Sequence, residues 1–510
     1  MNPPAAHVPP LPPLGSPDAA TPPARAAEQV DAVVVGGGIG GLVAARTLVQ
    51  RGLQVVVLEA SDRVGGPVRG GAFGSVPVRL DLGAESFAAR GTAVTDLADE
   101  LGLDVVSPAP LSAWGYAAGH AFPLPKAGVL GIPSTPWAPD VRRAIGWPGV
   151  LRASLDRVLP RFVADTTDLG SLVRSRLGRR VADRLVAPVA TGVHSAPLSR
   201  LDVAAVAPGL LDAFARTGSL SRAVGELRSA APAGSAVRGI DGGIHALVEA
   251  LTGEIAASAE EFADSPRTDA TGPIHAAVRV AQRVVAVERL GTQWQVTTSV
   301  GGTVRAPRLV VTTPRVAPLL APWVAPLEND PVTAPAGVVV PTPEEGADIW
   351  LATLLLDAPE LDDAPRGSGM LVAPDDEGAA SGVRAKALTH ATAKWPWLAD
   401  RVRAAVGPGV HVVRLSYGRI GTETVPPTAD EAARDASALL GVDLADRVRD
   451  HLLQRWDGSL PPPTPAYRAD VAAFTAAVGH TPGLAVTGGW VAGTGLAAIV
   501  AHAQAAVAAL

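Results

Sequence analysis

The 510-residue sequence contains no cysteine, and only 18% of its residues are charged. Without cysteine, the chain has no disulfide, no thiolate metal ligand, no cysteine nucleophile and no cysteinyl bond to a cofactor. The sequence also lacks a dense run of basic residues, and its net charge is −6. This charge pattern argues against nucleic acid as a partner, since proteins that bind nucleic acids carry basic patches that contact the phosphate backbone.

The composition predicts a well-packed protein of two or three domains, because 47% of the residues are hydrophobic and the chain is too long for one ordinary core. Residues 1–29 are rich in Pro and Ala and have no signal-peptide pattern, so they are interpreted as a disordered tail. No Asp, Glu, Lys or Arg follows Asp470. Glycine clusters at 487–489 and 493–495 favour a buried strand, a turn and a helix there over a membrane span.

A dinucleotide-binding pattern begins at residue 30. Residues 30–35 are β-branched and apolar, as in a central parallel strand, and Gly36, Gly38 and Gly41 follow in a G-x-G-x-x-G arrangement. A helix is expected over 41–51 and a second strand over 54–58. That strand ends in Glu59, which lies 59 − 36 = 23 positions after the first glycine and is the acid expected to accept ribose hydroxyls.

Three further segments resemble the flavin amine oxidase superfamily and imply that the dinucleotide is FAD. Because the chain has no cysteine, this FAD is expected to be held noncovalently. The first is Ala60–Gly66, with Arg63 before a glycine pair, and the second is 81–87, which in that superfamily passes beside the flavin ring. The third is the C-terminal strand, glycine-rich turn and helix over 483–510. The middle of the chain adds a helix from His245 and strands at 278–287, 294–300 and 309–313. The resemblance places these residues at FAD: Gly36, Gly38, Ile39, Gly40, Gly41, Glu59, Ala60, Arg63, Gly65, Gly66, Gly83, Ala84, Glu85, Ser86, Val284, Trp456, Gly488, Gly495, Leu496 and Ala497.

Other segments are similar to one family within that superfamily, the protoporphyrinogen and coproporphyrinogen III oxidases. The matching segments are the Glu-Ser-Phe-Ala-Ala-Arg stretch ending at Arg90, the Pro-Leu-Pro and Gly-Ile-Pro region over 123–133, the turn at 187–193, and Arg455-Trp456. This resemblance runs from about Val30 to Leu510. It implies a cytoplasmic haem-biosynthesis enzyme that oxidises coproporphyrinogen III to coproporphyrin III, with ferrochelatase as a possible partner.

The resemblance also implies that the cofactor carries the chemistry. The flavin N5 would take hydride from a bridging carbon, and dioxygen would reoxidise the flavin and release hydrogen peroxide. Cations would pair the substrate propionates, with Arg90 and Lys126 as candidates and Arg152 and Arg184 as weaker ones. No general base and no metal are expected.

The sequence departs from the family pattern at several positions. Gly91 stands where a Lys commonly follows Arg90, and Pro67 replaces a basic residue after the glycine pair. Gly495-Leu496-Ala497 stands in place of Gly-Ile-Pro, and the Gly-His pair expected after the Trp456 segment is absent near Tyr467. These departures bear on substrate affinity and on activity more than on FAD binding.

The predicted fold is α/β, with a discontinuous Rossmann-like FAD domain over 30–89, 239–314 and 466–510. A helical insertion is expected over 90–202, and a mixed α+β substrate domain over 203–238 and 315–465, with a helix at 429–440. Protoporphyrinogen IX oxidation, another flavin amine oxidase or desaturase activity, and a noncatalytic FAD-bearing scaffold remain alternatives. An amine oxidase usually has an aromatic cage, and only 3 Tyr and 7 Phe are present. The sequence leaves the oligomeric state open.

Overall fold

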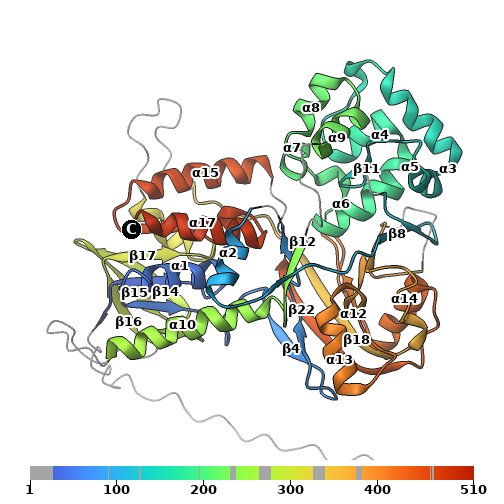
Figure 1. The fold of residues 1–510 in the computed structure, drawn as a ribbon. Coiled ribbons are helices and arrows are strands. Elements are labelled where there is room, and N and C mark those ends of the chain that lie inside the picture. The colour runs from blue at the N-terminus through green and yellow to red at the C-terminus, as the bar shows by residue number, and fades with distance from the viewer. Residues whose placement is uncertain are drawn as a thin grey trace, which may run out of the picture.

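The computed structural model describes residues 27–89, 91–125, 128–194, 196–229, 237–263, 277–324, 339–374, 382–459, 461 and 464–510. These residues form three parts: a parallel module around a five-stranded sheet, a sheet module around a seven-stranded sheet, and a helical lobe (Figure 1). Within the described residues, no helix is both long enough and apolar enough to cross a membrane.

The parallel module is organised around short valine-rich strands whose side chains are buried on both faces, as expected of a central parallel sheet. All strand pairs of its five-stranded sheet are parallel. In spatial order, the strands are β13 Val278–Arg279, β3 Val55–Leu58, β2 Ala32–Val35, β17 Arg308–Val311 and β23 Leu484–Val486.

Two hydrophobic cores cover this sheet. The helices α1 Ile39–Val49, α2 Ala93–Glu100, α10 His245–Ala263 and α17 Leu496–Ala508 share one core, in which Leu42, Leu251 and Val500 are fully buried. The other core includes Trp294 and Phe474 and lies under α11 Ala317–Leu320, α15 Pro465–Gly479 and a second sheet. That second sheet has the order β1 Glu28–Gln29, β16 Thr303–Ala306, β15 Gln293–Thr298 and β14 Val284–Leu290.

Two predictions about this module are corrected by the structure. Residues 28–29 are not part of a tail, because β1 pairs with β16 in parallel register. Residues 278–287 are not one strand either. Ala281 has a positive φ of 54°, and the chain turns there, so that β13 pairs with β3 whereas β14 pairs with β15.

The sheet module combines strands from two distant parts of the chain. Its order is β22 Val448–Ser459, β18 Ala347–Asp357, β21 Val410–Tyr417, β20 Ala387–His390, β19 Gly369–Val372, β8 Ala113–Ala117 and β9 His120–Pro123. The predicted helix at 429–440 is confirmed as α14 Ala429–Leu440, which covers one face. The opposite face packs on α12 Ala391–Lys394, α13 Pro396–Val406 and the hairpin of β4 Gly70–Ala72 and β5 Arg79–Asp81.

The helical lobe has its own core, built from α3 Pro139–Ser154, α4 Leu169–Leu177, α5 Arg179–Val181, α6 Ala187–His194, α7 Val203–Val206, α8 Leu210–Thr217 and α9 Leu220–Ser229. Between β9 and α3 lie β10 Gly128–Val129 and β11 Ile132–Pro133. A small sheet of β6 Phe87–Ala88, β12 Val237–Ile240 and β7 Val105–Val106 lies at the centre of Figure 1.

The packing moves three of the predicted domain boundaries. Residues 203–229 were predicted in the substrate domain, but their apolar side chains complete the core of the helical lobe. Strands β8 and β9 fall in the predicted helical insertion, but they extend the seven-stranded sheet. Residues 315–324 pack with the parallel module through Val316, Ala317 and Leu320.

A buried ion pair organises the helical lobe. Arg176 and Asp156 are both fully buried, with Nε 2.9 Å from Oδ1. The remaining guanidinium hydrogens bond backbone carbonyls, including those of Leu159 and Gly218. Asp156 also accepts hydrogen bonds from the backbone of Leu220 and Ser221 at the start of α9.

We expect Asp156→Asn to lower the free energy of unfolding by about 3–5 kcal/mol, because it leaves the Arg176 charge buried without its counterion. Urea denaturation followed by circular dichroism measures the loss. Glu226→Gln is the matched control, since its pair with Arg216 is exposed and worth about 0.5 kcal/mol. An equal loss of unfolding free energy in the two variants would contradict the role given to the buried Asp156–Arg176 pair.

Candidate functional site

The site begins where β2 passes into α1. Gly38 is the N-cap residue of α1, and no side chain caps this helix end. A Cβ on Gly41 would collide with the carbonyl oxygen of Gly36, so a side chain at 41 would open the turn. A Cβ on Gly38, in contrast, would have no atom within 4 Å. The turn therefore leaves open space in front of the backbone N–H groups of a helix N-terminus, where an anion is stabilised.

Glu59 follows β3 and lies beside this turn. Its Oε2 accepts a hydrogen bond of 2.6 Å from the backbone N–H of Gly37, and its Oε1 accepts one of 2.8 Å from that of Ser61. The segment before Val284 runs alongside, because Gln282 N–H donates to the carbonyl of Glu59. The structure thus brings Glu59 and Ala60 close to the strand that carries Val284, which is buried.

The glycine pair lies against the same turn. Gly65 forms a parallel bridge with Gly38 and donates to the carbonyl of Gly37 at 2.7 Å. Arg63 donates to the carbonyl of Gly66 at 2.9 Å and lies over the ring of Trp456, 5.4 Å from its centroid. Burial lowers the pKa of Arg63, with a further contribution from the nearby Arg69 charge.

Trp456 connects this turn to the loop at 83–86. Its indole N–H donates to the carbonyl of Leu82 at 3.0 Å, and a Cβ on Gly83 would lie 3.0 Å from its ring. Ala84 N–H donates to the carbonyl of Pro67 at 3.2 Å. The loop that holds Glu85 and Ser86 is therefore fixed between the parallel module and β22 of the sheet module.

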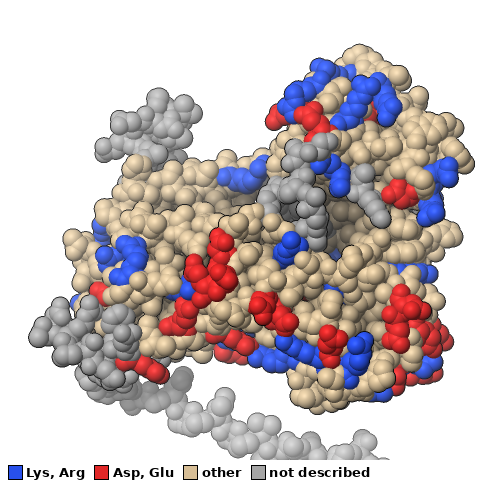
Figure 2. Space-filling view, in the orientation of Figure 1, with Lys and Arg blue, Asp and Glu red and all other residues tan. Residues whose placement is uncertain are grey.

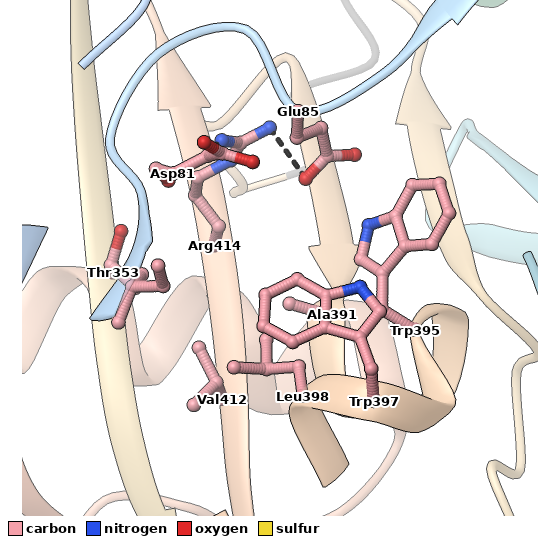
Figure 3. Close-up of a pocket in the computed structure, with 10 residues that line it drawn as sticks. Asp81, Glu85, Thr353, Ala391, Trp395, Trp397, Leu398, Val412 and Arg414 are labelled. Carbon is pink, nitrogen blue, oxygen red and sulfur yellow. Dashed lines mark hydrogen bonds and ion pairs between the residues drawn. The ribbon is translucent and has the colours of Figure 1, made fainter. Parts of the chain in front are cut away.

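Glu85 forms an ion-pair cluster with two cations of the sheet module. Lys394 Nζ donates to Glu85 Oε1 at 2.6 Å. Arg414 Nη2 lies 2.7 Å from Glu85 Oε2, and Figure 3 shows this pair. Arg414 also donates to the carbonyl of Gly83 at 2.9 Å. We call Glu85, Lys394 and Arg414 the Glu85 cluster. Burial alone would raise the pKa of Glu85, but Arg414 and Lys394 outweigh that effect and hold the pKa below its usual value.

A small cavity of about 20 Å³ lies beside the cluster, between β21 and α13. Glu85 and Arg414 line it on one side, and the rings of Trp395 and Trp397 line it on the other (Figure 3). A cavity of this size holds about one water molecule and is far too small for a ligand.

The C-terminal segment returns to the first turn. Gly488 has a φ of +98°, and its Cα would lie 2.9 Å from a Cβ on Gly40, so the two backbones are in close contact. The predicted glycine-rich turn contains a short helix, α16 Gly489–Ala492, before α17 begins. Gly495 is the N-cap residue of α17, again without a side-chain cap. Leu496 is buried in the core shared with α1, and Ala497 packs against that core.

Most of the residues predicted for the FAD site thus lie on turns that contact one another. The two cations predicted to bind the substrate cannot be placed in this site. Arg90 and Lys126 lie outside the described residues. Arg152 and Arg184, the weaker candidates, bond backbone carbonyls of the helical lobe: Arg152 bonds those of Ser175 and Arg176, and Arg184 bonds that of Ala144. Their contacts are structural.

The sequence prediction missed Lys394 and Arg414. One signal was present, because Lys394 is one of three lysines in the chain and is followed by Trp-Pro-Trp. Nothing in its spacing relates it to Glu85, which lies 309 positions away. Arg414 is an ordinary strand residue by sequence.

The residues present fit a dinucleotide cofactor. The α1 N-terminus and the open space at Gly38 suit a pyrophosphate, and the Glu59 carboxylate suits ribose hydroxyls. Throughout the described ranges, no group of three or more His, Cys, Asp or Glu side chains is arranged to hold a metal.

Comparisons with known proteins agree with this chemistry. The model of a family described as flavin containing amine oxidoreductase matches residues 39–337. Coproporphyrinogen III oxidase of Bacillus subtilis is 23% identical over 505 residues, which cover 93% of this chain and 96% of that protein. Coproporphyrinogen III oxidase of Propionibacterium freudenreichii is 34% identical over 188 residues, which cover 35% of this chain and about a third of that protein, 34%.

A solved structure shares the fold. The crystal structure of a putative protoporphyrinogen oxidase from Exiguobacterium matches with a TM-score of 0.70 at 21% identity, covering 94% of this chain and 98% of that one. At this identity the likeness establishes the fold alone, and it confirms the predicted α/β class.

We expect Gly38→Ala to remove the flavin and leave the fold intact, because the added methyl group fills open space in front of the helix end without meeting any protein atom. The ratio of flavin absorbance to protein absorbance after purification measures the loss. Gly253→Ala is the matched control, since Gly253 lies within α10 and a Cβ there also meets nothing within 4 Å. Full flavin content in Gly38→Ala would place the cofactor elsewhere.

We expect Glu85→Gln to destabilise the protein by about 3–5 kcal/mol at neutral pH, because Lys394 and Arg414 lose their buried counterion. The pKa of Glu85 is lowered on folding, so its contribution is fully present above the unfolded value, near 4.3, and is lost as the pH falls through the folded value. The stability gap between wild type and variant should therefore shrink below about pH 4.3 in urea titrations.

Glu360→Gln is the control for this pH dependence, because its pair with Arg447 is exposed on both sides. A gap for Glu85→Gln that stays constant down to the acid transition would show that the carboxylate charge is not what stabilises the cluster.

Proposed function

Since this chain belongs to the flavin-containing amine oxidoreductase family, we propose that it binds FAD noncovalently and oxidises a porphyrinogen, with coproporphyrinogen III as the preferred substrate. The observation that carries the proposal is the match to the Bacillus subtilis coproporphyrinogen III oxidase, which spans 96% of that protein. It includes the helical lobe and the sheet module, and these are the parts that distinguish substrates in a fold shared by many enzymes.

The parallel module would hold the cofactor. Backbone N–H groups at the N-terminus of α1 would receive the pyrophosphate, and Arg63, oriented by Gly66 and Trp456, would add positive charge beside it. Glu59 would accept hydrogen bonds from the ribose of the adenosine half, and Val284 would contact the adenine. The absence of cysteine removes a cysteinyl attachment and favours noncovalent binding.

The Glu85 cluster would fix the position of the cofactor-binding loop relative to the sheet module that forms part of the substrate site. FAD, when bound, supplies a two-electron acceptor for hydride from the substrate. The loop at 83–86 would lie along it, and the ion pairs to Lys394 and Arg414 would hold that loop at one distance from the seven-stranded sheet. Few rotamers remain open to three side chains that are at most 17% exposed.

The substrate would lie between the sheet module and the helical lobe. The surface is hollowed below the helical lobe in Figure 2. The small cavity beside Trp395 cannot hold a macrocycle, because its volume is only about 20 Å³. We propose that Arg90 and Lys126 pair the substrate propionates, that dioxygen accepts the electrons and that hydrogen peroxide is released. The cytoplasmic location and a contact with ferrochelatase remain predictions.

The test is aerobic oxidation by the purified, FAD-loaded protein, followed by the rise of porphyrin fluorescence over enzyme-free controls. We expect coproporphyrinogen III to be oxidised faster than protoporphyrinogen IX, with hydrogen peroxide formed. Faster oxidation of protoporphyrinogen IX would leave the family assignment unchanged but would make protoporphyrin IX the product.

The Gly38→Ala variant, expected to be folded and flavin-free, is the control for oxidation in air. If a folded, yellow protein oxidises neither porphyrinogen, the proposal that it is an oxidase is wrong, and a noncatalytic flavin-bearing scaffold is favoured.

A further inference from the structure

Two histidines and an aspartate form a hydrogen-bonded chain in the sheet module, next to the start of α12. His390 ends β20 and is fully buried, and His411 lies on the neighbouring strand β21. Nε2 of His390 lies 3.1 Å from Nδ1 of His411, and Nε2 of His411 lies 3.0 Å from Oδ1 of Asp362. The Asp362 side chain is 59% exposed, so the chain runs from the surface to the interior. We call these three residues the histidine chain.

The ionised Asp362 determines which ring nitrogens carry hydrogen. A carboxylate can only accept, so His411 donates from Nε2 and its Nδ1 is left as an acceptor. This acceptor faces two donors, the Nε2–H of His390 and, at 3.3 Å, the hydroxyl of Thr392. The Thr392 oxygen in turn accepts from the backbone N–H of Val412 at 3.2 Å. At neutral pH a single arrangement of hydrogens therefore satisfies these contacts.

The histidine chain has no favourable position for a further proton. On Nδ1 of His411 the proton would face two donors. On Nδ1 of His390 it would be buried, where no described residue provides an acceptor. Burial lowers the pKa of His390 to about 3, and the nearby His411 adds to this effect. Burial also lowers the pKa of His411, which Asp362 opposes and Arg403 of α13 reinforces.

The same contacts hold the segment that carries Lys394. His390 is the N-cap residue of α12, and Thr392 lies within this helix. Lys394 is its last residue and donates to Glu85 at 2.6 Å. A helix of four residues is not stable by its own hydrogen bonds, so its position depends on what it contacts. The histidine chain therefore anchors the start of the segment that ends in the Glu85 cluster.

We propose that the histidine chain is an acid-sensitive anchor for Lys394. When the pair of His390 and His411 takes up a proton, α12 separates from β21 and Lys394 leaves Glu85. The loop at 83–86 then keeps only the ion pair to Arg414, and bound FAD is released more readily. This inference rests on the proposed position of FAD along that loop, and it does not depend on the identity of the substrate.

The direction of the pH dependence follows from the lowered pKa values of the two histidines. The anchored pair favours its neutral form, whereas a released histidine titrates near pH 6.5. The stabilisation from the anchor is therefore fully present above about pH 6.5 and is lost as the pH falls below that value. The pKa of Glu85 is held below its usual value, near 4.3, so its own titration occupies a separate, more acidic range.

The experiment is an acid titration of the FAD-loaded protein from about pH 7.5 to about pH 5, which spans histidine titration. Fluorescence of free flavin measures release, and deuterium uptake by the backbone amides of α12 measures opening of the anchor. We expect both signals to rise together as the pH falls below about 6.5.

Two exposed charges should move this transition in opposite directions. Asp362→Asn should raise its midpoint by about half a pH unit, because without that carboxylate the anchored His411 resists protonation more strongly. Arg403→Gln should lower the midpoint by a similar amount, because Arg403 disfavours the charged ring. The Arg403 side chain is 66% exposed and that of Asp362 59%, so both variants should fold.

Asp363→Asn is the matched control, because it removes the same charge from an exposed position one residue further along. It should titrate like the wild type. Nitrogen NMR of histidine-labelled protein at neutral pH should find the hydrogen on Nε2 in both His390 and His411. Hydrogen on Nδ1 of either ring overturns the proposal.

Unchanged midpoints in Asp362→Asn and Arg403→Gln also overturn the proposal, and so does opening of α12 without release of flavin. None of these measurements uses porphyrinogen oxidation. Failure of the anchor is therefore distinguishable from failure of the proposed function.

Discussion

The close approach of backbone to backbone at the end of β2 is the constraint on which the remainder of the site depends. Gly36, Gly38 and Gly41 let the chain turn into α1 without side chains, and Gly40 lets the C-terminal segment reach the same point through Gly488. Gly65 closes the other side by its bridge to Gly38. Three segments that are far apart in the sequence therefore meet at one helix N-terminus. A side chain at Gly41 would separate Gly36 from α1, and the space in front of the helix dipole would be lost.

A second contact joins this module to the rest of the molecule. Arg414 and Lys394 come from the sheet module, and Glu85 comes from a loop of the parallel module. Ion pairs of this kind contribute little net stability, because desolvation offsets the Coulomb attraction, but a missing partner is costly. The cluster therefore specifies one relative placement of the two modules. Trp456 reinforces that placement by bonding Leu82 while its ring contacts Arg63.

The interior and the outer surface of the helical lobe differ in how charged and apolar side chains are placed. Inside, Asp156 and Arg176 satisfy the ends of several helical segments and leave α4 and α9 in fixed positions. Outside, seven large apolar side chains are exposed within residues 137–163. The same lobe contributes a rigid wall to the proposed substrate space.

The sequence by itself determined the elements that local chemistry specifies. The valine-rich strands, the glycine turn into α1, the acid at Glu59 and the helix α14 with its Thr428–Glu431 capping box follow from periodicity, glycine spacing and capping, which act within a few residues. The tertiary structure alone decided which distant residues meet. Lys394 and Arg414 lie more than 300 positions from Glu85, strands β8 and β9 join a sheet formed mainly by residues 347–459, and β1 pairs with β16. Pairings of that kind are set by how whole elements pack to bury apolar surface, and no short segment carries that information.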